Sequence, residues 1–235
     1  MFFLRKESNF RWVESIVKVR IFNIMIEQKL TKKEITDYFR SNIFESILAY
    51  SAWKIILGSR STGMIPADMV ERYVKIQKYH PEFFMSVEYS FLFQFVIKVL
   101  HSFDFREDSF SLYKINKETT KKFVLENKKI IKSLRDVRNK IFAHRDTEIN
   151  QETLKKYTIP PMNDLDQFFQ NLIDFYNSLT SIVDRSSTVF DNAYDIKNDI
   201  ENLFMNIERG ETIRKKEIDI KWQWSENSKK ASDLL

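Results

Sequence analysis

Several residue types on which common functional sites depend are absent or scarce in this chain of 235 residues. It has no cysteine, which excludes disulfides, thiolate metal sites and cysteine nucleophiles. Its three glycines form neither a GxGxxG nor a GxxxxGKS/T motif, so the glycine-rich loops that bind phosphate are absent. The three histidines, His80, His101 and His144, are far apart in the sequence, and no two have the spacing of metal ligands. We therefore expect no metal ion or other cofactor.

Residues that interrupt helices are also few, with only three glycines and four prolines. Because hydrophobic residues make up 43% of the chain and follow a helical period over long stretches, the sequence predicts an all-α protein with a sizeable core. Thr31-Lys32-Lys33-Glu34 fits a capping box, and Pro66 and Pro81 suit the first turns of two further helices. Helices are predicted for residues 10–28, 31–57, 66–79, 81–103, 116–143, 163–183 and 191–207.

The predicted helix at residues 81–103 is apolar on nearly all sides, which is typical of a helix at the centre of a bundle. Glu88, Gln94 and Lys98 interrupt its apolar run, so we interpret it as a core helix rather than a membrane span. The apolar run that begins at Met1 is too short for a signal peptide. We therefore expect a cytoplasmic protein that does not associate with a membrane.

Near the end of the chain the periodicity changes. Ile218, Ile220, Trp222 and Trp224 alternate with polar residues, which is typical of a half-buried strand that must pair with another segment. Residue Asn163 is expected to cap the helix before this region. We accordingly expect a helical bundle at residues 1–185, followed at residues 186–235 by an additional helix and a short strand-like tail of unknown role.

Positive charge is concentrated in one segment. Residues 114–145 contain eleven lysines and arginines and three acidic residues, a net charge of +8, while the rest of the chain has 27 basic and 30 acidic residues, a net charge of −3. Such a segment suits a surface that binds a polyanion. A solvated, lysine-rich helix face has the same composition, so charge alone leaves both interpretations open.

Within this segment Arg138 occupies an unexpected position. On a helical wheel with Leu134 at zero, an apolar stripe of Ile131, Val137 and neighbouring isoleucines lies within roughly 60°, and Arg138 falls inside it at about 40°. A guanidinium among aliphatic side chains is costly unless it is paired or lines a cavity. Arg138 is therefore expected either in a structural ion pair or in a polar site where helices pack.

His144, six residues further on, can transfer protons near neutral pH, which an arginine cannot do. Histidine suits proton transfer near neutral pH, and an adjacent cation stabilises a phosphate that gains charge in a transition state. These two groups suffice for metal-independent RNA cleavage in which the ribose 2′-OH is the nucleophile. Asn139 is placed to cap the helix or to orient the histidine, and the expected contacts to nucleic acid are Lys132, Arg135, Lys140 and Arg145. In the alternative interpretation Arg138 pairs with a buried acid such as Glu88, and His144 caps the helix C-terminus.

The run Arg138-Asn139-Lys140-Ile141-Phe142-Ala143-His144 resembles the signature of the HEPN superfamily, and the fuller run at residues 134–146 is similar to its abortive-infection, AbiU-like branch. The resemblance covers roughly residues 31–183. It implies a HEPN-type helical bundle that forms a homodimer and brings two motifs together. It further implies an endoribonuclease of phage defence or of a toxin–antitoxin system, with RNA as substrate and an antitoxin as a possible partner. Arg138 and His144 would be catalytic, and Asn139 supporting.

Three hypotheses follow from these residues. The first is a metal-independent endoribonuclease whose composite active site forms at a homodimer interface. The second is a catalytically inactive HEPN-like module that binds RNA, a nucleotide or a partner protein. The third is a helical scaffold whose strand at residues 218–224 docks on another protein.

Overall fold

The computed structural model describes residues 30–139, 159–191 and 195–232, and within these ranges it contains helices and no strand. The all-α prediction is therefore confirmed, while the predicted helix at residues 10–28 lies outside the described residues. The described α-helices are α2 (Lys32–Gly58), α3 (Ala67–Tyr79), α4 (Pro81–Ser102), α5 (Lys117–Glu126), α6 (Lys128–Val137), α8 (Met162–Asp184) and α9 (Ile196–Ser232), and a short 3₁₀ helix, η1, covers Leu112–Lys114.

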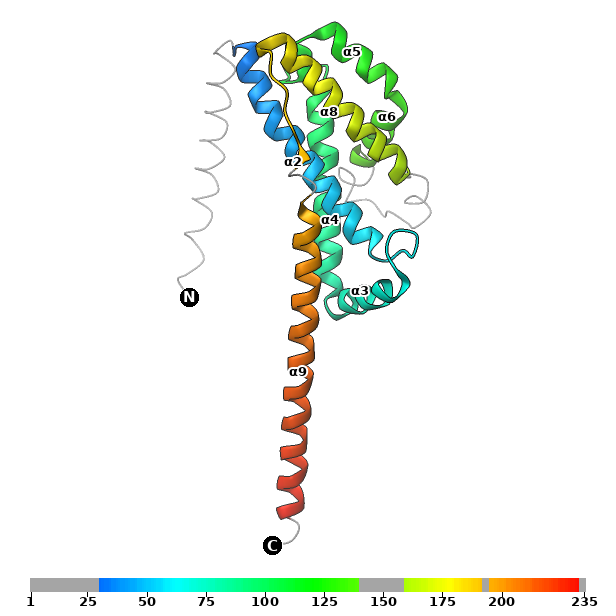
Figure 1. The fold of residues 1–235 in the computed structure, drawn as a ribbon, viewed down its shortest axis with the longest axis vertical. Coiled ribbons are helices and arrows are strands. Elements are labelled where there is room, and N and C mark those ends of the chain that lie inside the picture. The colour runs from blue at the N-terminus through cyan, green and yellow to red at the C-terminus, as the bar shows by residue number, and fades with distance from the viewer. Residues whose placement is uncertain (1–29, 140–158, 192–194, 233–235) are drawn as a thin grey trace, which may run out of the picture.

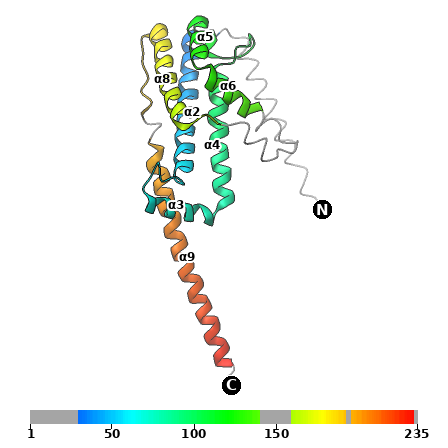
Figure 2. The ribbon, with the colours of Figure 1, turned by 90° about the vertical axis from the view of Figure 1, so that its right-hand side faces the viewer.

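The long helices α2 and α4 lie side by side and form the centre of the bundle (Figures 1 and 2). Helix α8 packs against α2, and α6 packs against both α4 and α8. At the opposite end, the first part of α9 lies against α2, and α3 packs against α4 and α9 (Figure 1). The rest of α9 extends away from the bundle as a single helix.

Local signals set the starts of several helices as the sequence predicts. The Thr31 hydroxyl accepts a hydrogen bond from the Glu34 amide at 3.2 Å, and the Glu34 carboxylate accepts one from the Thr31 amide at 2.8 Å, which completes the capping box. Asn116 caps α5 through its side-chain oxygen, and Pro81 is the first residue of α4. These short-range hydrogen bonds satisfy backbone N–H groups that a helix cannot satisfy itself.

Two clusters of buried side chains hold the helices together. The larger cluster joins α2, α4, α5, α6 and α8, and within it the Tyr50 and Phe169 rings stack with their centroids 4.5 Å apart. The smaller cluster joins α2, α3, α4 and α9. In it, Phe204 of α9 stacks on Tyr73 at 4.5 Å and on Phe84 at 5.5 Å, so the start of α9 is part of the packed body.

Helix α4 departs from the prediction of a helix buried on all sides. It packs along α2, but it also exposes Phe83, Met85, Tyr89 and Phe93. Its charged residues pair with α2 and the turn after it, Glu88 with Arg60 at 2.8 Å and Lys98 with Glu45 at 2.5 Å. Among the described helices, α4 alone is long and apolar enough to cross a membrane by length and composition. The central position is therefore correct for one face only, since the first half of α4 extends past the helices that would cover its other face.

The single basic helix predicted for residues 116–143 is interrupted at Asn127. Its side-chain nitrogen donates a hydrogen bond to the Phe123 carbonyl at 3.0 Å. The side chain thus competes with backbone N–H groups for a carbonyl of the last turn of α5. Two helices, α5 and α6, result. Helix α6 ends at Val137, and Arg138 and Asn139 continue it as a wider, π-helical turn.

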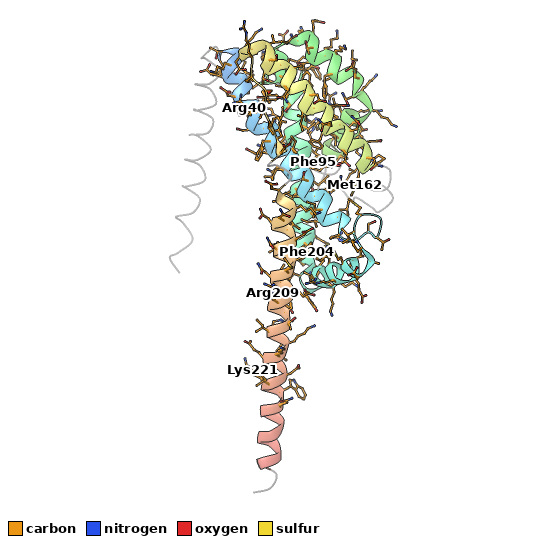
Figure 3. All side chains as sticks on the ribbon, in the orientation of Figure 1. Arg40, Phe95, Met162, Phe204, Arg209 and Lys221 are labelled. Atoms are coloured by element: carbon orange, nitrogen blue, oxygen red, sulfur yellow. The ribbon has the colours of Figure 1, made fainter. Side chains whose placement is uncertain are left out.

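The C-terminal predictions need two corrections. Pro161, not Asn163, stands at the N-terminus of α8, and Asn163 lies inside its first turn. The predicted strand is wrong because residues 218–224 belong to α9, a helix of 37 residues. Once Ile200 and Phe204 dock the start of α9, each further residue extends an existing helix and needs no new nucleus. Figure 3 shows Phe204 on the docked part of α9 and Lys221 on the projecting part.

Candidate functional site

A positively charged hollow of about 340 Å³ lies beside the end of α6. Helix α6 contributes Arg135 and Arg138, and the turn that follows α4 contributes Asp104 to Arg106. The remaining lining residues are Leu100 and Phe103. Three guanidinium groups against one carboxylate give the hollow an excess of positive charge, which favours an anionic ligand.

The packing of α6 determines which of its residues reach this hollow. Ile131, Leu134 and Val137 are buried at intervals of three and fix one face of the helix against the bundle. Arg135 is partly buried beside this face, and Arg138 is exposed. The expectation that Arg138 is buried among aliphatic side chains is therefore wrong. The backbone is regular up to Arg138, whose amide donates to the Leu134 carbonyl, but the residue follows the last turn of α6, at the edge of the bundle where a long side chain reaches water.

The ion pair considered for Arg138 is also not formed, because Glu88 binds Arg60 instead, at 2.8 Å. The Arg138 Nε donates a hydrogen bond to the Asn139 Oδ1 at 3.0 Å. Asn139 therefore orients the arginine, a role that sequence analysis had not assigned to it. Of the two interpretations of Arg138, the structure favours a polar site over a structural ion pair.

Arg106 is held in place by its neighbour Asp104. The Arg106 Nη2 lies 2.6 Å from the Asp104 Oδ2, its Nε lies 3.0 and 3.1 Å from the two carboxylate oxygens, and its amide donates to Oδ1 at 3.2 Å. The Arg106 guanidinium lowers the pKa of Asp104, so this carboxylate stays ionised. The pair leaves a net positive contribution from Arg135 and Arg138 in the hollow.

Phe105 stands out between these charged groups because 70% of its surface is exposed. The Arg135 guanidinium carbon lies 5.9 Å from the centroid of its ring, within the range of a cation–π interaction. The neighbouring Phe103 is fully buried, so the chain direction at the turn sends one aromatic ring into the core and the next into the solvent.

The structure brings together some of the residues expected at the site. Arg135, Arg138 and Asn139 lie together at the end of α6, and Lys132 is exposed one turn earlier but does not line the hollow. Lys140, His144 and Arg145 lie outside the described residues. Asp104, Phe105 and Arg106 were missed, because they precede Arg135 and Arg138 by about thirty positions and no local pattern links the two segments.

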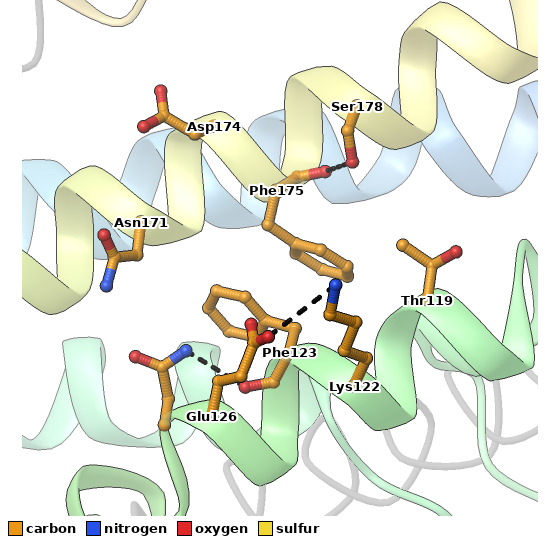
Figure 4. A pocket seen from close by; sticks show the side chains of 9 residues that line it. Thr119, Lys122, Phe123, Glu126, Asn171, Asp174, Phe175 and Ser178 are labelled. Carbon is orange, nitrogen blue, oxygen red and sulfur yellow. Dashed lines mark hydrogen bonds and ion pairs between the residues drawn. The ribbon is translucent and has the colours of Figure 1, made fainter.

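A second hollow, of about 440 Å³, lies between α5 and α8 (Figure 4). Phe123 and Phe175 stack below it with their centroids 4.4 Å apart. Its rim is close to charge balance, since Lys122 lies 3.8 Å from Glu126 and Asp174 is nearby. It therefore lacks the excess positive charge found beside Arg138. Within the described ranges, no three histidine, aspartate or glutamate side chains gather to suit a metal ion.

The motif at the end of α6 lies within a segment that matches a known protein family. The model of a HEPN family described as AbiU2 matches residues 33–204. The chain belongs to the AbiU2 family. The match confirms the resemblance to the abortive-infection branch of the HEPN superfamily, and it extends past residue 183 into α9. This AbiU2 chain is therefore a HEPN module of the abortive-infection type. No curated protein and no solved structure matches it.

Proposed function

We propose that this AbiU2 protein is a metal-independent endoribonuclease with a composite active site at a homodimer interface, and that it acts in phage defence or in a toxin–antitoxin system. The observation that supports this proposal is the position of Arg138. It is exposed at the end of α6, in a hollow that also holds Arg106 and Arg135. Arginines gathered in this way suit a phosphate that carries additional negative charge in a transition state.

The proposed reaction needs only groups of the protein and of the RNA. The ribose 2′-OH attacks the adjacent phosphorus, its proton passes to a base, and the P–O5′ bond breaks while an acid protonates the leaving 5′-oxygen. The products are a 2′,3′-cyclic phosphate and a 5′-hydroxyl. His144 supplies the proton transfer, Arg138 stabilises the charged phosphorane, and Asn139 orients Arg138 through its hydrogen bond.

The other residues expected to contact nucleic acid are basic and would bind the phosphates of the RNA strand. Arg135 lines the same hollow as Arg138, and Lys132 is exposed one turn earlier on α6, about 120° around the helix from Arg138. Lys140 and Arg145 would extend this line of positive charge beyond α6. Two such surfaces in a homodimer would form one basic groove, with a pair of Arg138–His144 sets at its centre.

The proposal is tested with full-length protein and a labelled single-stranded RNA in the presence of EDTA. We expect wild type to yield cyclic-phosphate products, His144→Ala to lose about 100- to 10,000-fold in rate, and Arg138→Ala about 100- to 1,000-fold. His80→Ala and Arg209→Ala are the matched controls, since both residues lie in or beside α9, away from the hollow. Equal cleavage by wild type and His144→Ala, or loss of cleavage in EDTA, contradicts the proposal.

Salt-dependent RNA binding without turnover is the outcome expected for an inactive HEPN-like module. The homodimer is tested separately by light scattering, which should give twice the 28.3 kDa of one chain. A monomer that retains full cleavage at nanomolar concentration would exclude the composite site.

A further inference from the structure

Among the described residues, Phe105 has no packing role that explains an aromatic side chain at its position. It lies on the turn after α4 and is 70% exposed, although removing a phenylalanine side chain from water is favourable. A single exposed apolar residue is common in proteins and carries little meaning alone. Phe105, however, lines the same hollow as Arg106, Arg135 and Arg138, and the guanidinium of Arg135 lies 5.9 Å from its ring centroid.

We propose that Phe105 is a stacking platform for an unpaired nucleobase of a single-stranded RNA bound at this hollow, with Arg135 at the edge of the platform and Arg138 on a flanking phosphate. This inference rests on the proposed function, which supplies the RNA. It adds a binding residue that lies on a different segment from the Arg138–His144 motif.

The chemistry of the hollow fits one nucleotide better than other anions. Proteins bind single-stranded RNA by stacking its bases on aromatic rings and guanidinium planes while cations contact the backbone. The hollow combines one exposed ring with three arginines, and its volume of about 340 Å³ is at the small end for ligand sites. A purely inorganic anion would need the arginines but not the ring.

Asp104 affects how a strand of RNA can bind in the hollow. Its carboxylate is bonded to Arg106, so one guanidinium is already oriented before RNA binds. Its negative charge also disfavours a phosphate in direct contact with this part of the wall. A strand is therefore expected to present a base, not a phosphate, over Phe105.

The test measures binding rather than cleavage, with a fluorescent single-stranded RNA, the full-length protein and anisotropy as the readout. Phe105→Ala should weaken binding about 5- to 150-fold, the loss typical of one stacked base. Phe105→Trp should bind at least as tightly as wild type, and Phe105→Leu, which keeps apolar volume but cannot stack, should behave like Phe105→Ala. Phe83→Ala is the matched control, because Phe83 is 51% exposed at the other end of α4.

Two further measurements separate stacking from charge. The dependence of affinity on salt should be unchanged in Phe105→Ala, whereas Arg138→Ala should reduce the slope by about 0.7, the value for one phosphate of a single strand. An RNA of equal length with abasic sites should bind wild type and Phe105→Ala alike.

The failure of this inference can be told apart from failure of the proposed function. RNA binding that depends on Phe105, without cleavage, supports the platform and contradicts the nuclease. Cleavage with equal RNA affinity in wild type, Phe105→Ala and Phe105→Leu supports the nuclease and overturns the platform. Preference for anionic lipid vesicles over RNA, or an equal loss in Phe83→Ala, also overturns it.

Discussion

At the scale of single residues, His101 combines a charged neighbourhood with an aromatic one. It lies near the end of α4, with its ring 5.9 Å from that of Tyr38 and 5.6 Å from that of Phe39. Burial lowers the pKa of His101 from its ordinary value of 6.5, Asp104 acts in the opposite direction, and Lys98 adds to the lowering. The native protein therefore favours the neutral imidazole.

This shift predicts a pH dependence of stability. Below about pH 6.5 the histidine of the unfolded chain takes up a proton that the native state resists, so the free energy of unfolding should fall as the pH decreases toward the lowered pKa. We expect urea midpoints between pH 7.5 and 5.5 to decline less steeply in His101→Gln than in wild type. Parallel pH profiles for the two proteins would contradict the assignment.

For Arg138, the sequence predicted that the residue matters but did not predict its surroundings. Its importance was visible in the sequence, because a cation among aliphatic residues requires a reason. Its environment was not, because a helical wheel does not show where a helix reaches the edge of the bundle. Arg138 follows the last turn of α6 and is exposed there, in a hollow that it shares with Arg106.

At the scale of elements, α9 is the helix for which local pattern and structure differ most. The alternation of Ile218, Ile220 and Trp222 fits a strand, yet Ile218 and Trp222 are also four apart, as on one face of a helix. The docked start of α9 decides between these two readings of the sequence, because it supplies the nucleus. No local pattern in the sequence shows that Ile200 and Phe204 dock on α3 and α4.

Gly210, in the middle of α9, tests this assignment. A Cβ at Gly210 would meet no atom within 4 Å, and its backbone is helical, so Gly210→Ala should stabilise the helix by about 0.5–1 kcal/mol. Gly210→Pro should instead break it, at a cost of roughly 3 kcal/mol. Ellipticity at 222 nm and amide exchange after residue 210 measure both changes. A strand would lose no helical signal in Gly210→Pro, which would refute the helix.

At the scale of the whole molecule, the bundle and the projecting part of α9 differ in how they are held. Phe204 is fully buried against Tyr73 and Phe84, whereas residues 212–223 are all exposed. The family match ends at residue 204, within the docked part. The proposed division at residue 185 remains a prediction, and the packing shows that α9 begins as part of the bundle core.

Two variants should therefore affect stability very differently. Deleting residues 223–235, which leaves Trp222 and the Lys215–Tyr79 hydrogen bond in place, should change the free energy of unfolding by less than about 0.5 kcal/mol. Phe204→Ala should cost about 3–5 kcal/mol, because it leaves a cavity between α3, α4 and α9. Urea unfolding measures both. A deletion as costly as Phe204→Ala would mean that the distal part of α9 packs against something in solution, such as a second copy.

The sequence by itself determined the all-α class, the capped starts of α2 and α5, the proline at the start of α4, the basic segment and the HEPN motif. Each depends on residues within a few positions of one another, where hydrogen bonds and periodicity act locally. Only the tertiary structure decided that Glu88 binds Arg60, that α9 remains helical, and that Asp104, Phe105 and Arg106 meet Arg138. These outcomes depend on how helices pack, and packing brings together side chains whose separation along the chain leaves no local pattern.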